Sequence, residues 1–139
     1  QTDPGDVLAA IALFEKHGTN IFAKGKRFGR PLSDFVFTIG MSIFETIYLW
    51  RRLWDINAQP NLFHRTFYES WRSPPEDFAL DLFVYAQARE RGLDVYRFPV
   101  NFGERLYGTS TWNVDWRSKV KFIRRTLDFS RNIKRRGRK

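Results

Sequence analysis

A helix signal that leads directly into a strand signal, between Ser73 and Val100, constrains the fold of this chain more than any other feature. Residues 73–77 combine a serine that can cap a helix, two prolines suited to a first turn, and two acidic residues that the helix dipole favours there. Apolar residues then recur at helical spacing up to Gly92, and Val95 to Val100 alternates and is rich in strand-forming residues. A helix that feeds a strand is half of a layered unit, so the sequence predicts an α/β fold.

The rest of the chain also alternates between helix and strand signals. Asp3 and Pro4 supply a cap and a first-turn proline for a helix that ends near Lys16, because Gly18 follows. Glycine and proline punctuate the basic residues after the next apolar run. We therefore predict, in order, a strand at Ile21 to Ala23, a cationic loop from Lys24 to Pro31, a helix capped by Ser33 and ending near Leu49, a strand at Leu62 to Phe67, a loop from Gly103 to Asn113 and a helix from Trp116.

The size and composition of the chain limit its functions. Its 139 residues are enough for one domain, and 42% hydrophobic and 17% aromatic residues are enough to bury a core. The absence of cysteine excludes disulfides, thiol catalysis and thiolate metal sites. A net charge of +9 favours anionic partners such as phosphates, nucleic acid or a lipid surface.

The start of the chain and its longest apolar stretch bear on its location. The chain opens at Gln1 without an initiator methionine or a charged and then apolar leader, so we predict no signal peptide and expect a cut from a longer protein. The apolar stretch from Phe35 to Trp50 is interrupted by polar residues, whereas a spanning helix needs about 20 mostly apolar residues. We therefore predict that the stretch does not cross a bilayer.

Four short segments contain a pattern of acidic, basic and glycine residues. They are Gln1 to Pro4, Lys24 to Arg27, Asp55 to Pro60 and, the most specific of them, Phe102 to Ser110. In order and residue type these segments resemble the second half of family 2 glycosyltransferases of the type that includes dolichyl-phosphate mannose synthases. Where that family usually has a lysine after the last segment, this chain has Thr111.

The resemblance implies a fold and an activity. Residues 1–115 would form the acceptor-side half of the catalytic domain, a partial GT-A type (Rossmann-like) three-layer sandwich that lacks the N-terminal nucleotide-binding strands. Residues 116–139 would form a basic amphipathic helix and tail. The activity would be transfer of a sugar from a nucleotide-sugar donor to a lipid-phosphate, hydroxyl or glycan acceptor. Because both metal-binding aspartates would precede residue 1, we expect no catalysis by this chain alone.

The resemblance also implies the residues of the site. A divalent metal, Mg2+ or Mn2+, would bind the donor diphosphate with Gln1 among its ligands. Arg105 would contact the diphosphate, because its planar guanidinium can make two parallel bonds to a phosphate. Further substrate-binding candidates are Arg27, Asn57, Gln59, Gly103 and Ser110.

Two aspartates compete for the role of catalytic base. Asp77, next to Glu76, resembles the acidic pair with which many inverting enzymes of the family deprotonate an acceptor hydroxyl. Plain charge complementation at the start of a helix explains the pair equally well. Asp55, followed by two amide side chains, is the second candidate. If the acceptor is a lipid phosphate, no base is needed.

The last helix and two rival functions complete the expectations. Its apolar residues form two stripes separated by basic residues, and we place Phe122 and Phe129 on the lipid side of a helix that lies on an anionic membrane. Burial of both stripes against protein in the complete enzyme explains the pattern equally well. The enzyme would then be cytoplasmic and peripheral at the inner face of the membrane. The alternatives are a basic nucleic-acid-binding module without catalysis, for which no known motif is present, and a purely structural membrane anchor.

Overall fold

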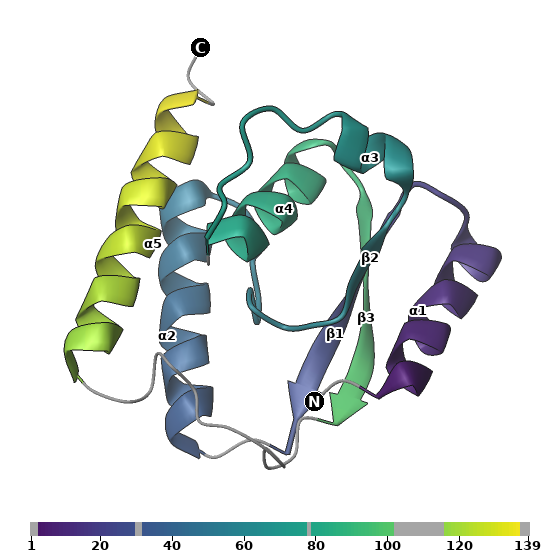
Figure 1. Ribbon diagram of the computed structural model, residues 1–139, viewed down its shortest axis with the longest axis horizontal. Coiled ribbons are helices and arrows are strands. Elements are labelled where there is room, and N and C mark those ends of the chain that lie inside the picture. Colours follow the sequence, from purple (N-terminus) through teal and green to yellow (C-terminus); the bar gives the residue numbers. More distant parts are fainter. Residues whose placement is uncertain (1–2, 30–31, 78, 102–115, 137–139) are drawn as a thin grey trace.

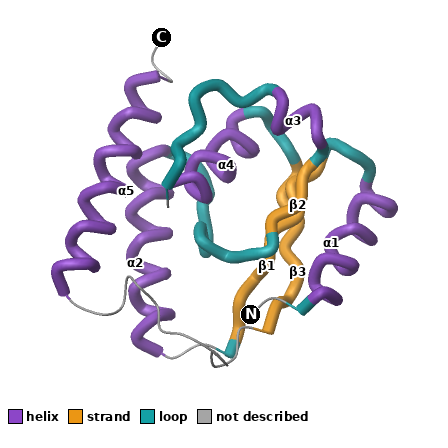
Figure 2. The backbone as a smooth tube through the Cα atoms, viewed as in Figure 1, coloured by secondary structure: helices purple, strands orange, loops and turns teal. Residues whose placement is uncertain are grey.

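The described part of the chain forms a small mixed sheet with helices on both of its faces. The computed structural model describes residues 3–29, 32–77, 79–101 and 116–136 (Figure 1). In chain order the elements are α1 (Pro4–His17), β1 (Ile21–Phe28), α2 (Leu32–Leu49), β2 (Asn61–Phe63), α3 (Arg65–Glu69), α4 (Ala79–Glu90), β3 (Asp94–Asn101) and α5 (Trp116–Arg136). The strand order is β2-β1-β3, with β1 antiparallel to β2 and parallel to β3 (Figure 2). The predicted α/β class is confirmed.

Alternation along β1 explains why the sheet is covered on both faces. Successive residues of a strand point to opposite faces, so Phe22 packs into one core with Tyr85 of α4 while Ala23 packs into another with Ala10 of α1. Helices α2 and α5 lie side by side beyond α4, in a further layer on the same side of the sheet (Figure 1). The arrangement is broadly compatible with an α/β sandwich.

Several predicted elements are confirmed because their signals are local. Asp3 caps α1, with its side chain accepting a hydrogen bond from the N–H of Gly5 at 2.7 Å, and Gly18 follows the helix with a φ of 79°. The predicted strand from Val95 to Val100 lies within β3. The last helix begins at Trp116, as predicted.

The predicted cationic loop after Ala23 is wrong as far as Phe28. Residues 24–28 continue β1, because that strand pairs with β3 along its whole length, from Ile21 opposite Asp94 to Phe28 opposite Asn101. The pairing satisfies the backbone polar groups of both strands, and this outweighs the weak strand propensity of the lysines and the glycine.

Two other predicted boundaries are also wrong. The strand predicted over residues 62–67 ends at Phe63, and His64 then caps the short helix α3 by accepting a hydrogen bond from the N–H of Thr66 at 3.3 Å. The helix predicted from Ser73 begins at Ala79, and Ser73 has a left-handed φ of 49° rather than the extended conformation of a capping residue.

The expected orientation of α5 is wrong for Phe129. The ring of Phe129 packs edge-on against Phe83 of α4, with ring centroids 6.4 Å apart, so it faces protein rather than lipid. The side chain of Phe122 lies outside the described residues. None of the helices, over the residues described, is long and apolar enough to cross a membrane.

Candidate functional site

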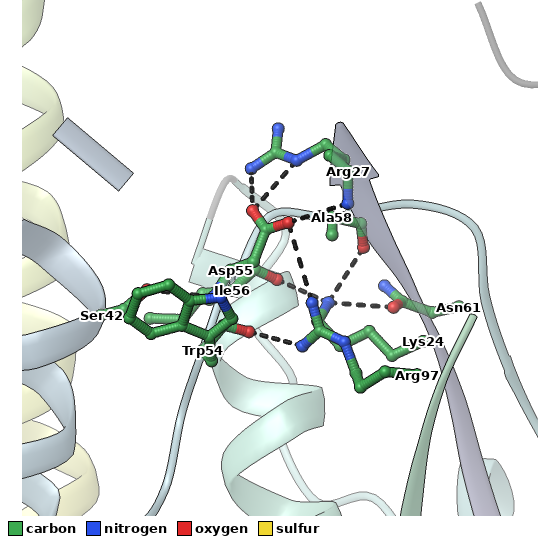
Figure 3. Close-up of polar contacts among 9 residues, drawn as sticks. All are labelled: Lys24, Arg27, Ser42, Trp54, Asp55, Ile56, Ala58, Asn61 and Arg97. Atoms are coloured by element: carbon green, nitrogen blue, oxygen red, sulfur yellow. Dashed lines mark hydrogen bonds and ion pairs between the residues drawn. The ribbon is translucent and has the colours of Figure 1, made fainter. Parts of the chain in front are cut away.

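A cluster of charged and amide side chains lies where β1, β3, α4 and residues 55–61 meet. This Lys24 cluster consists of Lys24, Arg27, Asp55, Gln59, Asn61, Asp81 and Arg97. Figure 3 shows the contacts of its members other than Gln59 and Asp81.

Lys24 is fully buried and holds the segment before β2 against β1. Its ammonium group donates to the carbonyl oxygens of Ile56 at 2.7 Å and Ala58 at 2.9 Å, and to the Oδ1 atom of Asn61 at 3.0 Å. Burial lowers the pKa of Lys24 to about 7, against the opposing negative charge of Asp81. Because its three donors are used, Lys24 acts on the site by positioning the neighbouring segment.

Gly25 lets the same segment approach the strand closely. Its N–H donates to the carbonyl oxygen of Pro60 at 3.0 Å. A Cβ at this position would lie 2.4 Å from the carbonyl oxygen of Gln59, which is too short for any real contact. Glycine is therefore needed here to bring the side chain of Gln59 into the cluster.

Asp55 is a buried carboxylate that anchors two arginines. It accepts hydrogen bonds from the backbone N–H of Arg27 at 3.2 Å and from its Nε at 3.0 Å, and it also contacts the Nη2 atom of Arg27. The Nη2 atom of Arg97 lies 3.7 Å from the Oδ2 atom of Asp55. The backbone N–H of Asp55 donates to Ser42 of α2 at 3.0 Å, so this residue ties α2 to both parallel strands.

Arg97 retains unused hydrogen-bonding capacity. Its Nη1 atom donates to the carbonyl oxygen of Trp54 at 2.6 Å. Its Nε and Nη2 atoms are buried and make no hydrogen bond within the described part of the chain. Buried donors are almost always paired in native proteins. The ion pair with Asp55 provides a partner for Nη2, and Nε is the donor of Arg97 for which the described residues offer none.

Asp81, in the first turn of α4, is the second carboxyl group of the cluster. Unlike Asp55, it has no hydrogen bond to an arginine among the described residues. Its Oδ1 atom accepts from Gln59 at 2.7 Å and from Asn61 at 3.4 Å. Its Oδ2 atom makes no hydrogen bond among the described residues. Burial raises the pKa of Asp81, while the charge of Lys24 and the bond from Gln59 oppose that rise. A half-buried carboxyl with a raised pKa and an oxygen that no described residue binds is suited to accept a proton.

The structure brings three of the predicted site residues together and separates others. Arg27, Asp55 and Gln59 belong to the Lys24 cluster, and Asn57 is exposed in the same segment. Asp77 instead caps α4, accepting from the N–H of Ala79 at 2.9 Å, and lies 4.0 Å from Arg125 of α5. These contacts agree with its interpretation as a helix cap, and its catalytic role stays a prediction. Gln1, Gly103, Arg105 and Ser110 lie outside the described residues.

Sequence reasoning missed four members of the cluster, which are Lys24, Asn61, Asp81 and Arg97. The signal that could have found them is a charge inside an apolar pattern. Lys24 follows the apolar run that starts β1, Arg97 interrupts the alternation of β3, and Asp81 interrupts the apolar residues of α4. Burial of a charged group costs free energy unless hydrogen bonds or an ion pair offset it, so such a residue marks a place where polar partners are expected.

The implied metal finds no ligand set in this part of the protein. No group of three or more histidine, aspartate or glutamate side chains occurs among the residues that the structure describes. The carboxylate oxygens of Asp55 are occupied by arginines, and one oxygen of Asp81 is bound by amides. The described residues therefore do not fit a divalent metal, and no step below depends on one.

Comparisons with known proteins do not extend this description. Neither the models of protein families, nor the curated proteins, nor the solved structures gave a match to this chain. The resemblance to family 2 glycosyltransferases therefore stays a prediction from the sequence.

Proposed function

We propose that this chain is the acceptor-side half of a family 2 glycosyltransferase of GT-A type, which transfers a sugar from a nucleotide-sugar donor to a hydroxyl or lipid-phosphate acceptor. The observation that carries the proposal is the Lys24 cluster, in which the proton-accepting carboxyl of Asp81 lies beside the cationic side chains of two parallel strands. In open α/β sheets, ligands bind at the carboxyl ends of the strands. Arg27 is the second-to-last residue of β1 and therefore lies near the carboxyl end of that strand.

Asp81 is the base of the proposed transfer to a hydroxyl. The acceptor oxygen forms a bond to the anomeric carbon of the donor sugar, its proton moves to the Oδ2 atom of Asp81, and the nucleoside diphosphate leaves with the bonding electrons. The raised pKa of Asp81 supports this assignment over Asp55, whose carboxylate is already engaged by two guanidinium groups. With a phosphate acceptor the nucleophile is already an anion, and Asp81 has no proton to remove.

Arginine side chains would stabilise the departing diphosphate. Charge develops on its oxygens in the transition state, and donors that are already oriented stabilise such charge most effectively. Asp55 holds Arg27 and Arg97 in fixed positions, so that both guanidinium groups are already oriented beside the site. Arg105 retains the role in diphosphate binding that the sequence resemblance implies for it.

The outer helical layer supports a peripheral position on an anionic membrane. Four apolar side chains of α2 and the segment just after it are exposed at helical spacing: Ile43, Phe44, Ile47 and Trp50. Helix α5 lies beside α2 and carries the exposed cations Arg117, Lys121, Arg124, Arg125 and Arg131. An apolar stripe next to basic side chains fits the boundary between lipid headgroups and acyl chains, so α2 takes the role that the sequence suggested for Phe129.

Substitution of the two aspartates near the start of α4 tests the proposal in the full-length protein. With a hydroxyl acceptor, Asp81→Asn is expected to lower sugar transfer by at least about 100-fold, the usual contribution of a general base. Asp77→Asn compares the two candidate bases, because asparagine caps a helix as well as aspartate does. If Asp81 is the base, Asp77→Asn should leave transfer and the melting temperature nearly unchanged, whereas a comparable loss of transfer would return the role of base to Asp77.

A ligand panel separates the enzyme from the nucleic-acid alternative. Nucleotide sugars with each common base are expected to raise the melting temperature of the full-length protein, because a ligand that binds only the folded state stabilises it. Single-stranded oligonucleotides should not. Stabilisation by oligonucleotides alone, with no transfer from any donor, would favour the nucleic-acid-binding module.

A further inference from the structure

A groove of about 490 Å³ lies between α4, α5 and the segment that joins α3 to α4. On α4 the groove is lined by Phe83, Gln87 and Glu90, and Arg91 follows the helix directly. These residues lie from the second turn of α4 to just beyond its end, whereas Asp81 of the Lys24 cluster lies in its first turn. None of the residues of the Lys24 cluster lines it. Its volume is in the range of small-molecule sites, which is about 300–1,000 Å³.

Two aromatic rings form the apolar part of the groove. Phe83 is buried and Phe129 is half-buried, and their rings meet edge to face with centroids 6.4 Å apart. Phe83 is in turn packed edge-on against Trp71, at 5.6 Å, so its position is fixed by the core. The partly exposed ring of Phe129, supported by the buried ring of Phe83, favours a planar apolar group of a ligand.

The charged lining of the groove is effectively cationic. Arg72 and Arg91 both line it, and Glu90 is the acidic residue of its lining. Both carboxylate oxygens of Glu90 are already engaged, one by Arg51 at 3.2 Å and the other by the amide of Gln87 at 3.0 Å. The charge of Glu90 is therefore offset locally, and the two arginines remain to attract an anion.

One of the two arginines is held in place and the other is not. Arg91 donates to the carbonyl oxygen of Ser70 at 3.1 Å, and its guanidinium lies 6.0 Å from the ring centroid of Phe67. Arg72 is exposed and has no hydrogen bond or ion pair with any described residue. An oriented guanidinium beside one with all its donors available is suited to bind a doubly charged oxyanion.

We propose that this groove is a second ligand site, which takes a small organic anion made of a planar apolar group joined to a phosphate or a carboxylate. The apolar group lies on Phe83 and Phe129, and the anionic group binds Arg72 and Arg91. The hydroxyl of Ser73 and the amide of Asn132, which also line the groove, supply further donors. The site is separate from the proposed catalytic cluster and does not depend on its function.

Isothermal titration of the full-length protein with phenyl phosphate, inorganic phosphate and benzyl alcohol tests the proposal. Because both parts of the ligand contribute, phenyl phosphate is expected to bind at least about tenfold more tightly than either of the other two probes. Loss of one charge-assisted hydrogen-bond donor in Arg72→Gln should weaken phenyl phosphate by about tenfold. Arg65→Gln is the matched control, because Arg65 is exposed on α3, pairs with Glu69 and does not line the groove.

A second variant and a competition experiment distinguish the groove from other anion sites. Phe129→Leu should weaken phenyl phosphate while leaving inorganic phosphate unchanged, because it alters only the apolar surface. Phenyl phosphate should still bind when a nucleotide sugar saturates the catalytic site. Equal affinity for phenyl phosphate and inorganic phosphate would overturn the proposal. So would binding that is unaffected by Arg72→Gln, or binding that the nucleotide sugar abolishes.

Discussion

Glu45→Gln should stabilise the protein at alkaline pH and leave it unchanged at acidic pH. Glu45 lies on α2, fully buried, and both of its oxygens are 2.7 Å from the hydroxyl of Ser130 on α5. That hydroxyl is also 2.8 Å from the carbonyl oxygen of Thr126. One hydroxyl proton cannot serve three acceptors, so a proton on Glu45 completes the network. Burial accordingly raises the pKa of Glu45 to about 7.

The expected stability change follows from the two pKa values. In the unfolded chain the pKa is near 4.5, so the folded protein binds this proton more tightly by about 2.5 pKa units. At 1.36 kcal/mol per unit, this amounts to about 3 kcal/mol. That stability is fully present below the unfolded pKa and is lost as the pH rises through about 7. Glutamine stays neutral and does not lose it.

Urea unfolding at about pH 4, below the unfolded pKa of 4.5, and at about pH 8.5 measures the effect. At the higher pH Glu45→Gln should be more stable than the wild type by about 3 kcal/mol, or about 10 °C in melting temperature for a chain of this size. Glu69→Gln is the control, because the side chain of Glu69 is 52% exposed and its loss should change stability little at either pH. A variant that is less stable than the wild type at the higher pH, or a difference that does not vary with pH, would refute the reasoning.

Three further predictions concern the packing of the cluster and the outer layer. Gly25→Ala should destabilise the protein by about 3 kcal/mol in urea unfolding, because the new Cβ would collide with the carbonyl oxygen of Gln59, whereas Gly40→Ala on α2, with nothing within 4 Å of its Cβ, should be neutral or gain about 1 kcal/mol; equal effects would contradict the close approach. Lys24 has a lowered pKa of about 7, so the wild type should gain stability as the pH rises from 7 toward 10.5, and Lys24→Met should show no such gain in thermal melts. Combined Ile47→Ser and Trp50→Ser should reduce sedimentation of the full-length protein with anionic liposomes, as should added salt, because these side chains are 67% and 87% exposed and the neighbouring helix α5 carries exposed cations; sedimentation unchanged by both would count against membrane binding.

The elements that could be predicted from the sequence are those with local signals. Asp3 and Gly18 delimit α1 because capping involves only residues in and next to the helix. The alternation in β3 indicates a strand without knowledge of its neighbours. The sequence also indicates Asp77 as one of two acids at a helix start, although it favours Ser73 as the cap, and the structure shows that Asp77 accepts the hydrogen bond.

The candidate site could be predicted only in part. Arg27, Asp55 and Gln59 were identified from the residue types of their segments, but the sequence did not indicate that Asp55 would bind Arg27 across 28 positions of the chain. Asp81 was missed because its environment comes from Gln59, Asn61 and Lys24, which are contributed by other elements.

The α/β class and the positions of most helices can be read from the sequence, because helical spacing and caps act over one or two turns. Lys24 is buried within a strand rather than exposed in a loop, and this depends on tertiary contacts. The reason is that its hydrogen-bond acceptors, the carbonyl oxygens of Ile56 and Ala58, are more than 30 residues away and meet it only when β1 lies between β2 and β3. A buried charge is stable only when such partners are in place, and partners at that separation depend on the packing of the whole sheet.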